Sequence, residues 1–195
     1  MGKLKNQLRK AKHIGRWLLF FIFIMLILFI FSLPAKLFDD PTSTVVFDRD
    51  GVLLGARIAH DGQWRFPDTD SVPEKFKTCL LAFEDRHFYH HPGVNPFALS
   101  RALIQNISRG EIVSGGSTIT MQTIRLSRKG KARTIVEKFV EMWLALRLEC
   151  SYSKDEILNL YASHAPFGGN VVGLDAAAWR YYGRSASQLS WAESE

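Results

Sequence analysis

The chain has 195 residues, of which 47% are hydrophobic and 23% are charged, enough for a membrane anchor and one modest domain but not for two enzymatic domains. Its formal net charge is +6, yet six of the 25 Lys and Arg residues precede Trp17, and the other 19 match the 19 acidic residues. The body of the chain is therefore neutral, which excludes nucleic-acid binding as the reason for the basic composition.

The N-terminal region predicts a single membrane anchor. Residues 1–16 form a basic tail, and residues 17–33 are an uncharged run rich in Phe, Ile and Leu that ends near Pro34. Such a run is at the short end of what spans a bilayer, and basic residues before it place the tail in the cytoplasm and the rest outside. The alternative is a cleaved signal peptide, but Ser32-Leu33-Pro34-Ala35 is a poor cleavage site.

Residues 34–71 predict a β-hairpin and a connection into the main domain. Residues 44–47 and 52–54 are apolar or β-branched, and they flank an Asp-Arg-Asp-Gly turn at residues 48–51. The two cysteines, Cys79 and Cys150, stand in apolar, helix-like surroundings, and we expect buried free thiols.

From residue 72 to residue 195 the apolar pattern is helical, which predicts a mainly α-helical domain that ends incomplete. We expect helices from residue 74, over 96–108, over 133–149, over 153–163 and over 175–182, with a further helix start at residue 190. Ser153 followed by Glu156 is a capping box, which explains this stretch better than the Ser-x-x-Lys motif of penicillin-reactive enzymes, whose companion motifs are absent.

Glu84 is the first candidate for chemistry. It follows Phe76 and Leu80 at spacings of four, so on a helix it lies at the edge of the apolar stripe. Partial desolvation would strengthen this carboxylate as a general base. The simpler alternative, favoured for Glu84 taken alone, is a surface residue paired with Arg86 or a nearby His. His87, His90 and His91 lack the spacing of zinc ligands, so no metal site is expected there.

The second candidate is the run of glycine and hydroxyl residues over 115–122. Two glycines followed by Ser and Thr residues are suited to holding an oxyanion, although the run lacks the Gly-Lys-Ser/Thr ending of a phosphate-binding P-loop. Five cations follow within nine residues: Arg125, Arg128, Lys129, Lys131 and Arg133. The pattern predicts a pyrophosphate site, and the alternative is a flexible loop beside a solvated charge run.

The third candidate lies on the helix expected over residues 133–149. Arg133, Glu137 and Glu141 are spaced by four and share one face. They form either a surface salt-bridge ladder or a site in which Arg133 faces a phosphate and Glu137 orients it or a metal.

Four ordered motifs resemble those of the glycosyltransferase family 51 domain of class A penicillin-binding proteins. They are Glu84-Asp85-x-x-Phe88-x-x-His91-x-Gly93, residues 115–122, Arg133-x-x-x-Glu137 and Lys154-x-x-Ile157-Leu158-x-x-Tyr161. The chain departs from the family at Met121, Thr134 and Ser163, where many members have Gln, Lys and Asn. Residues 91–97 and 165–170 are further similar to the penicillin-binding protein 1C subgroup.

The resemblance implies a lysozyme-like, mainly helical fold that polymerises lipid II into β-1,4-linked glycan strands and releases undecaprenyl pyrophosphate. It implies that Glu84 is the general base, that Arg125 and Arg133 stabilise the leaving pyrophosphate, and that Glu137 supports the phosphates through Mg²⁺ or Mn²⁺. The implied substrate-binding residues are Arg86, Phe88, His91, Gly116, Ser117, Thr118 and Gln122, besides Arg125 and Arg133.

The resemblance also implies partners and a location. The partners are lipid II, the growing glycan strand and other cell-wall synthesis proteins, with no nucleic acid, and the location is the cytoplasmic (inner) membrane with the catalytic domain outside. Members of the subgroup continue into a transpeptidase domain, so we expect this chain to be an N-terminal fragment. Two alternatives remain: a hydrolase of the same fold with Glu84 as general acid, and a non-catalytic membrane-anchored partner of another synthase.

Overall fold

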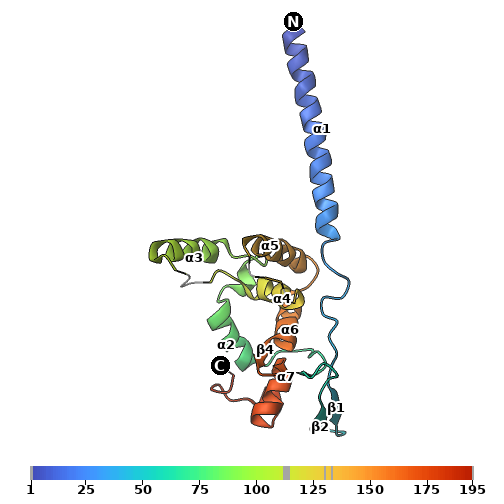
Figure 1. Cartoon of the computed structure of the whole chain (residues 1–195), viewed down its shortest axis with the longest axis vertical. Coiled ribbons are helices and arrows are strands. Elements are labelled where there is room, and N and C mark those ends of the chain that lie inside the picture. The colour runs from blue at the N-terminus through green and yellow to red at the C-terminus, as the bar shows by residue number, and fades with distance from the viewer. Residues whose placement is uncertain (1, 112–114, 130, 133, 195) are drawn as a thin grey trace. The chain divides into compact units, whose positions relative to one another are not determined.

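The computed structural model describes residues 2–111, 115–129, 131–132 and 134–194, and the chain divides into two compact units, Met1–Ala35 and Lys36–Glu195 (Figure 1). The first unit is dominated by one helix, α1 (Gly2–Ile30), which includes the basic tail as well as the apolar run. Its stretch His13–Ile30 is long and apolar enough to cross a membrane. The helix ends three residues before the predicted boundary at Leu33, where the Ser32 hydroxyl donates a 2.8 Å hydrogen bond to the Phe29 carbonyl.

The predicted hairpin is confirmed at the start of the second unit. Strands β1 (Thr44–Phe47) and β2 (Leu53–Arg57) pair antiparallel, with Val45 opposite Ala56. The Asp48 carboxylate closes the turn, because its Oδ1 accepts hydrogen bonds from the backbone N–H groups of Asp50 at 2.9 Å and Val52 at 2.8 Å.

The prediction of a mainly α-helical domain is also confirmed. The predicted helices correspond to α2 (Glu74–Glu84), α3 (Pro96–Arg109), α5 (Ile135–Glu149) and α6 (Lys154–His164). Helix α5 begins after residue 133, because the Thr134 side chain caps it by accepting from the Glu137 N–H. The predicted capping box of Ser153 and Glu156 starts α6.

One central helix was not predicted. Residues Ile119–Ser127, which include the second half of the hydroxyl run, form α4. Ile119, Met121 and Ile124 of this helix are fully buried, and α4 packs against both α5 and α6 (Figure 1). The alternative of a flexible loop over the whole run is therefore wrong, since only residues up to Thr118 precede the helix.

Short elements complete the unit. A 3-10 turn, η1 (Phe88–His90), follows α2, and the strands β3 (Trp64–Arg65), β4 (Pro166–Gly168) and β5 (Val171–Val172) form a small sheet in the order β3-β5-β4 that was not predicted. The helix expected over 175–182 comprises α7 (Leu174–Ala177) and a π-helical turn, η2 (Ala178–Tyr182), before η3 (Ala186–Gln188).

Two local predictions were wrong. Ser190 and Glu193 hydrogen-bond each other's backbone N–H groups, at 3.3 and 2.8 Å, but they close a turn rather than start a helix within the described residues. Both cysteines are free, yet Cys150 is exposed and Cys79 is only half-buried, so neither is a buried thiol.

Candidate active site

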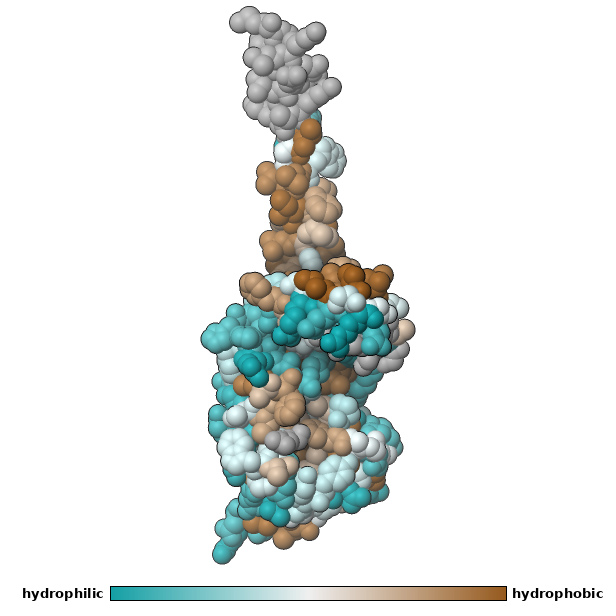
Figure 2. All heavy atoms as spheres, turned by 90° about the vertical axis from the view of Figure 1, so that its left-hand side faces the viewer, coloured by the Kyte–Doolittle hydropathy of each residue, from teal (hydrophilic) through white to brown (hydrophobic). Residues whose placement is uncertain are grey.

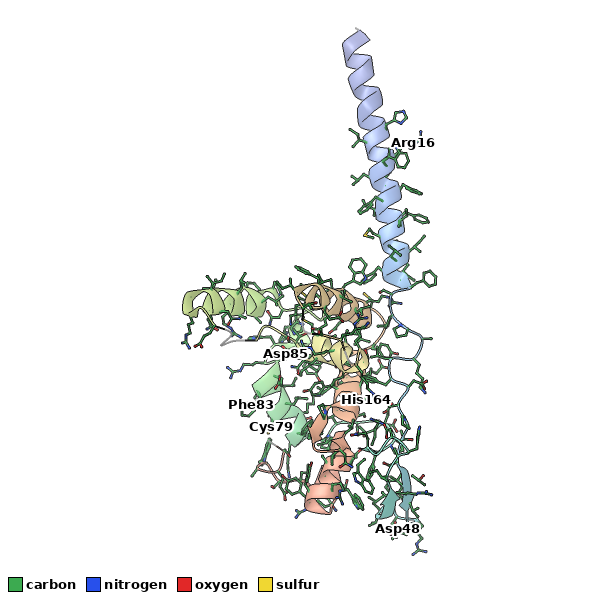
Figure 3. The ribbon with its side chains drawn as sticks, viewed as in Figure 1. Arg16, Asp48, Cys79, Phe83, Asp85 and His164 are labelled. Carbon is green, nitrogen blue, oxygen red and sulfur yellow. The ribbon has the colours of Figure 1, made fainter. Side chains whose placement is uncertain are left out.

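Glu84 is the last residue of α2, and its neighbour Asp85 anchors that end of the helix. Asp85 is buried, both of its carboxylate oxygens lie 3.0 Å from Nε2 of His91, and its Oδ2 accepts a 3.2 Å hydrogen bond from the Ile119 N–H (Figure 3). A carboxylate at the first N–H groups of α4 also complements the helix dipole. Asp85 thus joins the C-terminal end of α2 to the N-terminal end of α4.

The Glu84 side chain itself is exposed. The expectation that the protein partly desolvates it was wrong, because the core stripe of α2 ends one turn earlier, at Leu80. The alternative pairing with Arg86 or a nearby His is not found either, since the contact made by Glu84 is with Gln122: Gln122 Nε2 donates a 2.7 Å hydrogen bond to Glu84 Oε2.

Phe88 and His91, two predicted substrate contacts, lie behind this surface. Phe88 is 1% exposed, and its ring meets the His91 ring edge-on with the two centroids 6.4 Å apart. Lys154 Nζ lies 4.4 Å from the centroid of the Phe88 ring. Neither ring borders the cavity beside Glu84. In this structure both residues support the backbone of the turn rather than face a ligand.

The loop before α4 is held by its own polar groups. The Thr118 hydroxyl caps α4 by accepting from the Met121 N–H at 3.1 Å and donates to the Gly93 carbonyl at 2.5 Å. Gly116 is needed for close packing, since a Cβ there would lie 2.9 Å from the Leu99 Cα of α3. Thr118 and Gly116 thus have structural roles in this loop, while their predicted substrate contacts stay predictions, and Ser117 is the residue of the run that hydrogen-bonds cations.

Ser117 lies where two cations converge. Arg125 Nη2 donates to Ser117 Oγ at 3.1 Å, and Lys138 Nζ also hydrogen-bonds this oxygen. Glu141, which is 5% exposed, receives two 2.8 Å hydrogen bonds from the Arg125 guanidinium, and this carboxylate raises the pKa of Arg125 above its ordinary value. From the sequence, Glu141 was only a member of the third candidate, and Lys138 was not among the candidate site residues.

The cations that follow the hydroxyl run, predicted from the sequence to form a pyrophosphate site, are largely paired with carboxylates. Arg128 Nε and Nη2 bind the Glu137 carboxylate at 2.6 and 3.2 Å, and Lys129 pairs with Asp40. Arg128 lowers the pKa of Glu137, so this carboxylate stays ionised. Glu137 thus lies against Arg128, and within the described part of the chain it has no hydrogen bond or ion pair with Glu84 or Ser117. Arg133 lies outside the described residues.

A cavity of about 440 Å³ opens beside Glu84. Arg86 and Arg101 border it, and neither guanidinium forms an ion pair with any described residue. Arg86 was predicted, whereas Arg101 on α3 was missed, although its place on the polar side of an amphipathic helix was visible in the sequence. Ser117, Phe83 and Phe97 also border this cavity, which we call the Glu84 cavity.

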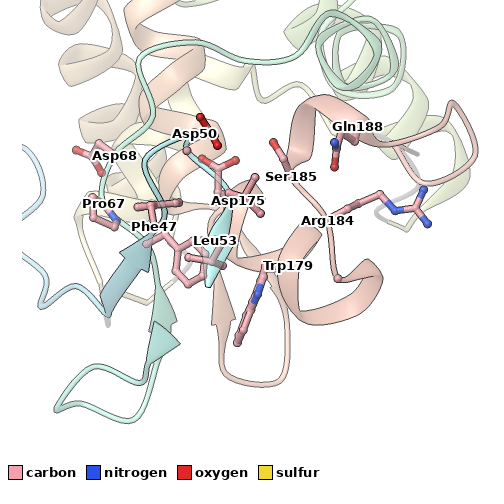
Figure 4. A pocket seen from close by; sticks show the side chains of 14 residues that line it. Phe47, Asp50, Leu53, Pro67, Asp68, Asp175, Trp179, Arg184, Ser185 and Gln188 are labelled. Atoms are coloured by element: carbon pink, nitrogen blue, oxygen red, sulfur yellow. The ribbon is translucent and has the colours of Figure 1, made fainter. Parts of the chain in front are cut away.

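A second cavity of about 600 Å³ lies elsewhere, between the hairpin and the segment that includes η2 and η3 (Figure 4). Its lining includes Phe47, Phe66, Asp175 and Trp179 but none of the predicted site residues. Burial raises the pKa of Asp175. The Glu84 cavity is bordered by residues of the first two motifs, among them Glu84 and Ser117, so that cavity is the candidate active site.

The described residues contain no group of three or more His, Cys, Asp or Glu side chains that could hold a metal ion. Glu137, the expected link to a metal, is occupied by Arg128, and Glu141 is occupied by Arg125. Each of these two carboxylates is already paired with a guanidinium, so the described donor groups do not fit a protein-bound Mg²⁺ or Mn²⁺.

Comparison with known proteins agrees with this geometry. The family model described as "Transglycosylase" matches residues 51–195. The chain is 43% identical over 162 residues to penicillin-binding protein 1C of Escherichia coli, covering 83% of this chain and 21% of that protein. It is 33% identical over 181 residues to penicillin-binding protein 1A of Aquifex aeolicus, covering 89% of this chain and 25% of that protein. The chain thus spans about a fifth to a quarter of the length of these relatives.

Proposed function

Because the chain belongs to the transglycosylase family, whose model covers residues 51–195, we propose that its second unit is a peptidoglycan glycosyltransferase that polymerises lipid II into β-1,4-linked glycan strands. The observation that carries this proposal is the lining of the Glu84 cavity. One exposed carboxylate and two guanidinium groups, those of Arg86 and Arg101, border the same space, and neither guanidinium has an acidic partner among the described residues.

Each part of this lining has a task in glycosyl transfer. The Glu84 carboxylate accepts the proton of the 4-hydroxyl of the acceptor sugar, whose oxygen attacks C1 of the growing chain. The bond between C1 and the pyrophosphate oxygen breaks with inversion, and undecaprenyl pyrophosphate leaves. Removal of a general base costs about 10²–10⁴-fold in rate, so Glu84 accounts for a substantial part of the catalysis.

The cations stabilise the leaving group. Arg86 and Arg101 are unpaired with described residues, so a pyrophosphate entering the cavity is free to take both guanidinium groups. Each charge-assisted hydrogen bond is worth about 1.5–3 kcal/mol. Arg125 and Lys138 add positive charge beside Ser117, although Glu141 neutralises part of it.

An apolar surface next to the cavity supports a lipid-linked substrate. Phe83 and Phe97, at the cavity rim, are 77% and 84% exposed. The exposed side chains of Leu103, Ile104 and Ile107 continue the apolar surface along α3, and Figure 2 shows brown side chains gathered on this unit. We assign this surface to the polyprenyl tail and the membrane, since apolar patches of this kind mark such contacts.

The N-terminal helix supports the same location. A helix that is apolar enough to cross a bilayer, preceded by basic residues, favours an N-terminus in the cytoplasm and a catalytic unit outside the cytoplasmic membrane. This placement brings the catalytic unit to the membrane surface from which a polyprenyl substrate cannot diffuse away.

The proposal is tested by incubating the purified protein in detergent with fluorescent lipid II. The expected products are a ladder of glycan strands and free undecaprenyl pyrophosphate, both abolished by moenomycin. A hydrolase would instead shorten preformed glycan strands without consuming lipid II. That result, or the absence of any change in lipid II, would contradict the proposal.

A further inference from the structure

We propose that Gln122 and Tyr161 are positioning residues, which hold the Glu84 carboxylate so that one of its oxygens is presented to the acceptor hydroxyl. The inference rests on the proposed function, since it assigns the groups that orient its general base. It gives Gln122 a role different from the contact with donor groups that the motif resemblance implies, and it gives Tyr161 a role that the sequence did not indicate.

The three side chains come from three helices, and Glu84 is the one of the three that borders the Glu84 cavity. Glu84 ends α2, Gln122 lies in the first turns of α4, and Tyr161 lies in α6. Helices α4 and α6 pack directly against each other, and Gln122 and Tyr161 are both half-buried. The position of Gln122 is therefore fixed by the core, whereas the exposed Glu84 takes its orientation from Gln122.

The donor and acceptor atoms of the three side chains determine which group donates each hydrogen bond. Gln122 Nε2 donates to Glu84 Oε2 at 2.7 Å, and the Tyr161 hydroxyl donates to Gln122 Oε1 at 3.5 Å. An amide donates only through its nitrogen and accepts only through its oxygen. The longer contact is weak, but it favours the amide orientation in which the nitrogen faces Glu84.

The Tyr161 hydroxyl keeps its proton at neutral pH. Burial, and to a smaller extent the negative charge of Glu84, raises the pKa of Tyr161 to about 12. The phenol is therefore neutral and keeps its proton for Gln122.

The arrangement suits a general base. Oε2 of Glu84 is occupied by Gln122, while Oε1 has no hydrogen-bond partner among the described residues and is left for the acceptor hydroxyl. A neutral amide can donate to Oε2 both before and after Oε1 takes up a proton. A cation in the same place would stabilise the ionised form much more strongly and so weaken the base.

The test compares Gln122→Met, which keeps an unbranched side chain but removes the N–H donor, with Tyr161→Phe, which removes one hydroxyl. We expect Gln122→Met to lower kcat for lipid II polymerisation by about 10–100-fold and Tyr161→Phe by about two- to fivefold, with KM nearly unchanged. The acid limb of the pH profile of kcat reports the base in the enzyme–substrate complex. Because a donor to the carboxylate is lost, this limb should move to higher pH, more for Gln122→Met than for Tyr161→Phe.

The matched control is Tyr181→Phe, which removes a hydroxyl that binds the Phe167 carbonyl at 3.2 Å outside the site. It should leave kcat and the acid limb unchanged. If Gln122 and Tyr161 have a purely structural role, their variants will lower thermal stability and kcat without moving the acid limb. If they bind substrate, the variants will raise KM instead. Either result would overturn the proposal. If the unmodified protein does not polymerise lipid II, the proposed function fails first, and the positioning role falls with it.

Discussion

Arg125 and Glu141 form a bidentate ion pair between α4 and α5, in which Nε and Nη2 of Arg125 each lie 2.8 Å from a different oxygen of Glu141. The Glu141 carboxylate is buried, so the pair fixes the guanidinium plane. The same Nη2 reaches Ser117 Oγ at 3.1 Å. Glu141 is therefore the carboxylate that orients a cation next to the loop before α4.

This relationship predicts that Glu141→Gln lowers kcat/KM for lipid II about tenfold or more and lowers the free energy of unfolding by about 2 kcal/mol, the scale of a lost charge-assisted pair. Lipid II turnover and urea denaturation measure the two effects. The matched control is Glu137→Gln, which removes the partner of Arg128. A larger loss of activity in Glu137→Gln than in Glu141→Gln would restore the assignment made from the sequence.

Gly93 should resist substitution for two separable reasons. Its φ is 85°, and an added Cβ would lie 2.8 Å from the Ala145 carbonyl oxygen. Gly93→Ala should lower the free energy of unfolding by about 2–4 kcal/mol, combining positive-φ strain with overpacking. Gly62 has a φ of 76° but no atom within 4 Å of its Cβ position, so Gly62→Ala should cost about 1–2 kcal/mol, the strain alone. Equal costs in urea denaturation would refute the close contact.

The apolar side of α3 should enter lipid. In a background with Cys79 and Cys150 replaced by Ser, Ile107→Cys carries an environment-sensitive fluorophore on the exposed apolar side. Gln105→Cys carries it on the polar side of the same helix. In lipid nanodiscs the emission at position 107 should shift to the blue and that at position 105 should not. The same emission at both positions would contradict a membrane contact by α3.

The burial of Tyr161 has a consequence for stability at high pH. Because its pKa is raised to about 12 from about 10, the folded and unfolded chains are equally protonated at this residue below pH 10, and the contribution of Tyr161 is fully present there. Between pH 10 and 12 the unfolded state releases this proton first. The free energy of unfolding should therefore fall by up to about 1.4 kcal/mol per pH unit. Tyr161→Phe should lack this slope in urea titrations, and Tyr181→Phe should keep it.

Much of the fold was predictable because helix boundaries depend on local signals. The capping box at Ser153 and the apolar spacing before Glu84 act within one or two turns, and both led to the correct helices. Helix α4 was missed because two glycines precede it and its Thr and Ser residues have low helix propensity. Its stability comes from burying Ile119 and Ile124 against other helices.

The sequence predicted which residues belong to the site better than it predicted what each of them contacts. Of the predicted site residues, Gln122 and Arg125 lie on α4, and Glu84 is hydrogen-bonded to Gln122. Ion pairs between residues far apart in the sequence could not be predicted, because the sequence does not show which distant residues meet. Lys129 and Asp40, for example, are paired although 89 positions separate them. The exposure of Glu84 was also hidden, since helical periodicity does not tell where the core ends along a helix.

The central claim is that Glu84 is the general base, and the kcat of Glu84→Gln for lipid II polymerisation tests it most directly. The substitution keeps the shape of the side chain and an oxygen that accepts from Gln122, but it replaces the carboxylate by an amide, which cannot act as a base. The control is Glu74→Gln at the exposed opposite end of α2. We predict that Glu84→Gln lowers kcat by at least about a hundredfold at unchanged thermal stability, while Glu74→Gln retains full activity. Glycan strands formed by Glu84→Gln at a near-normal rate would contradict the account.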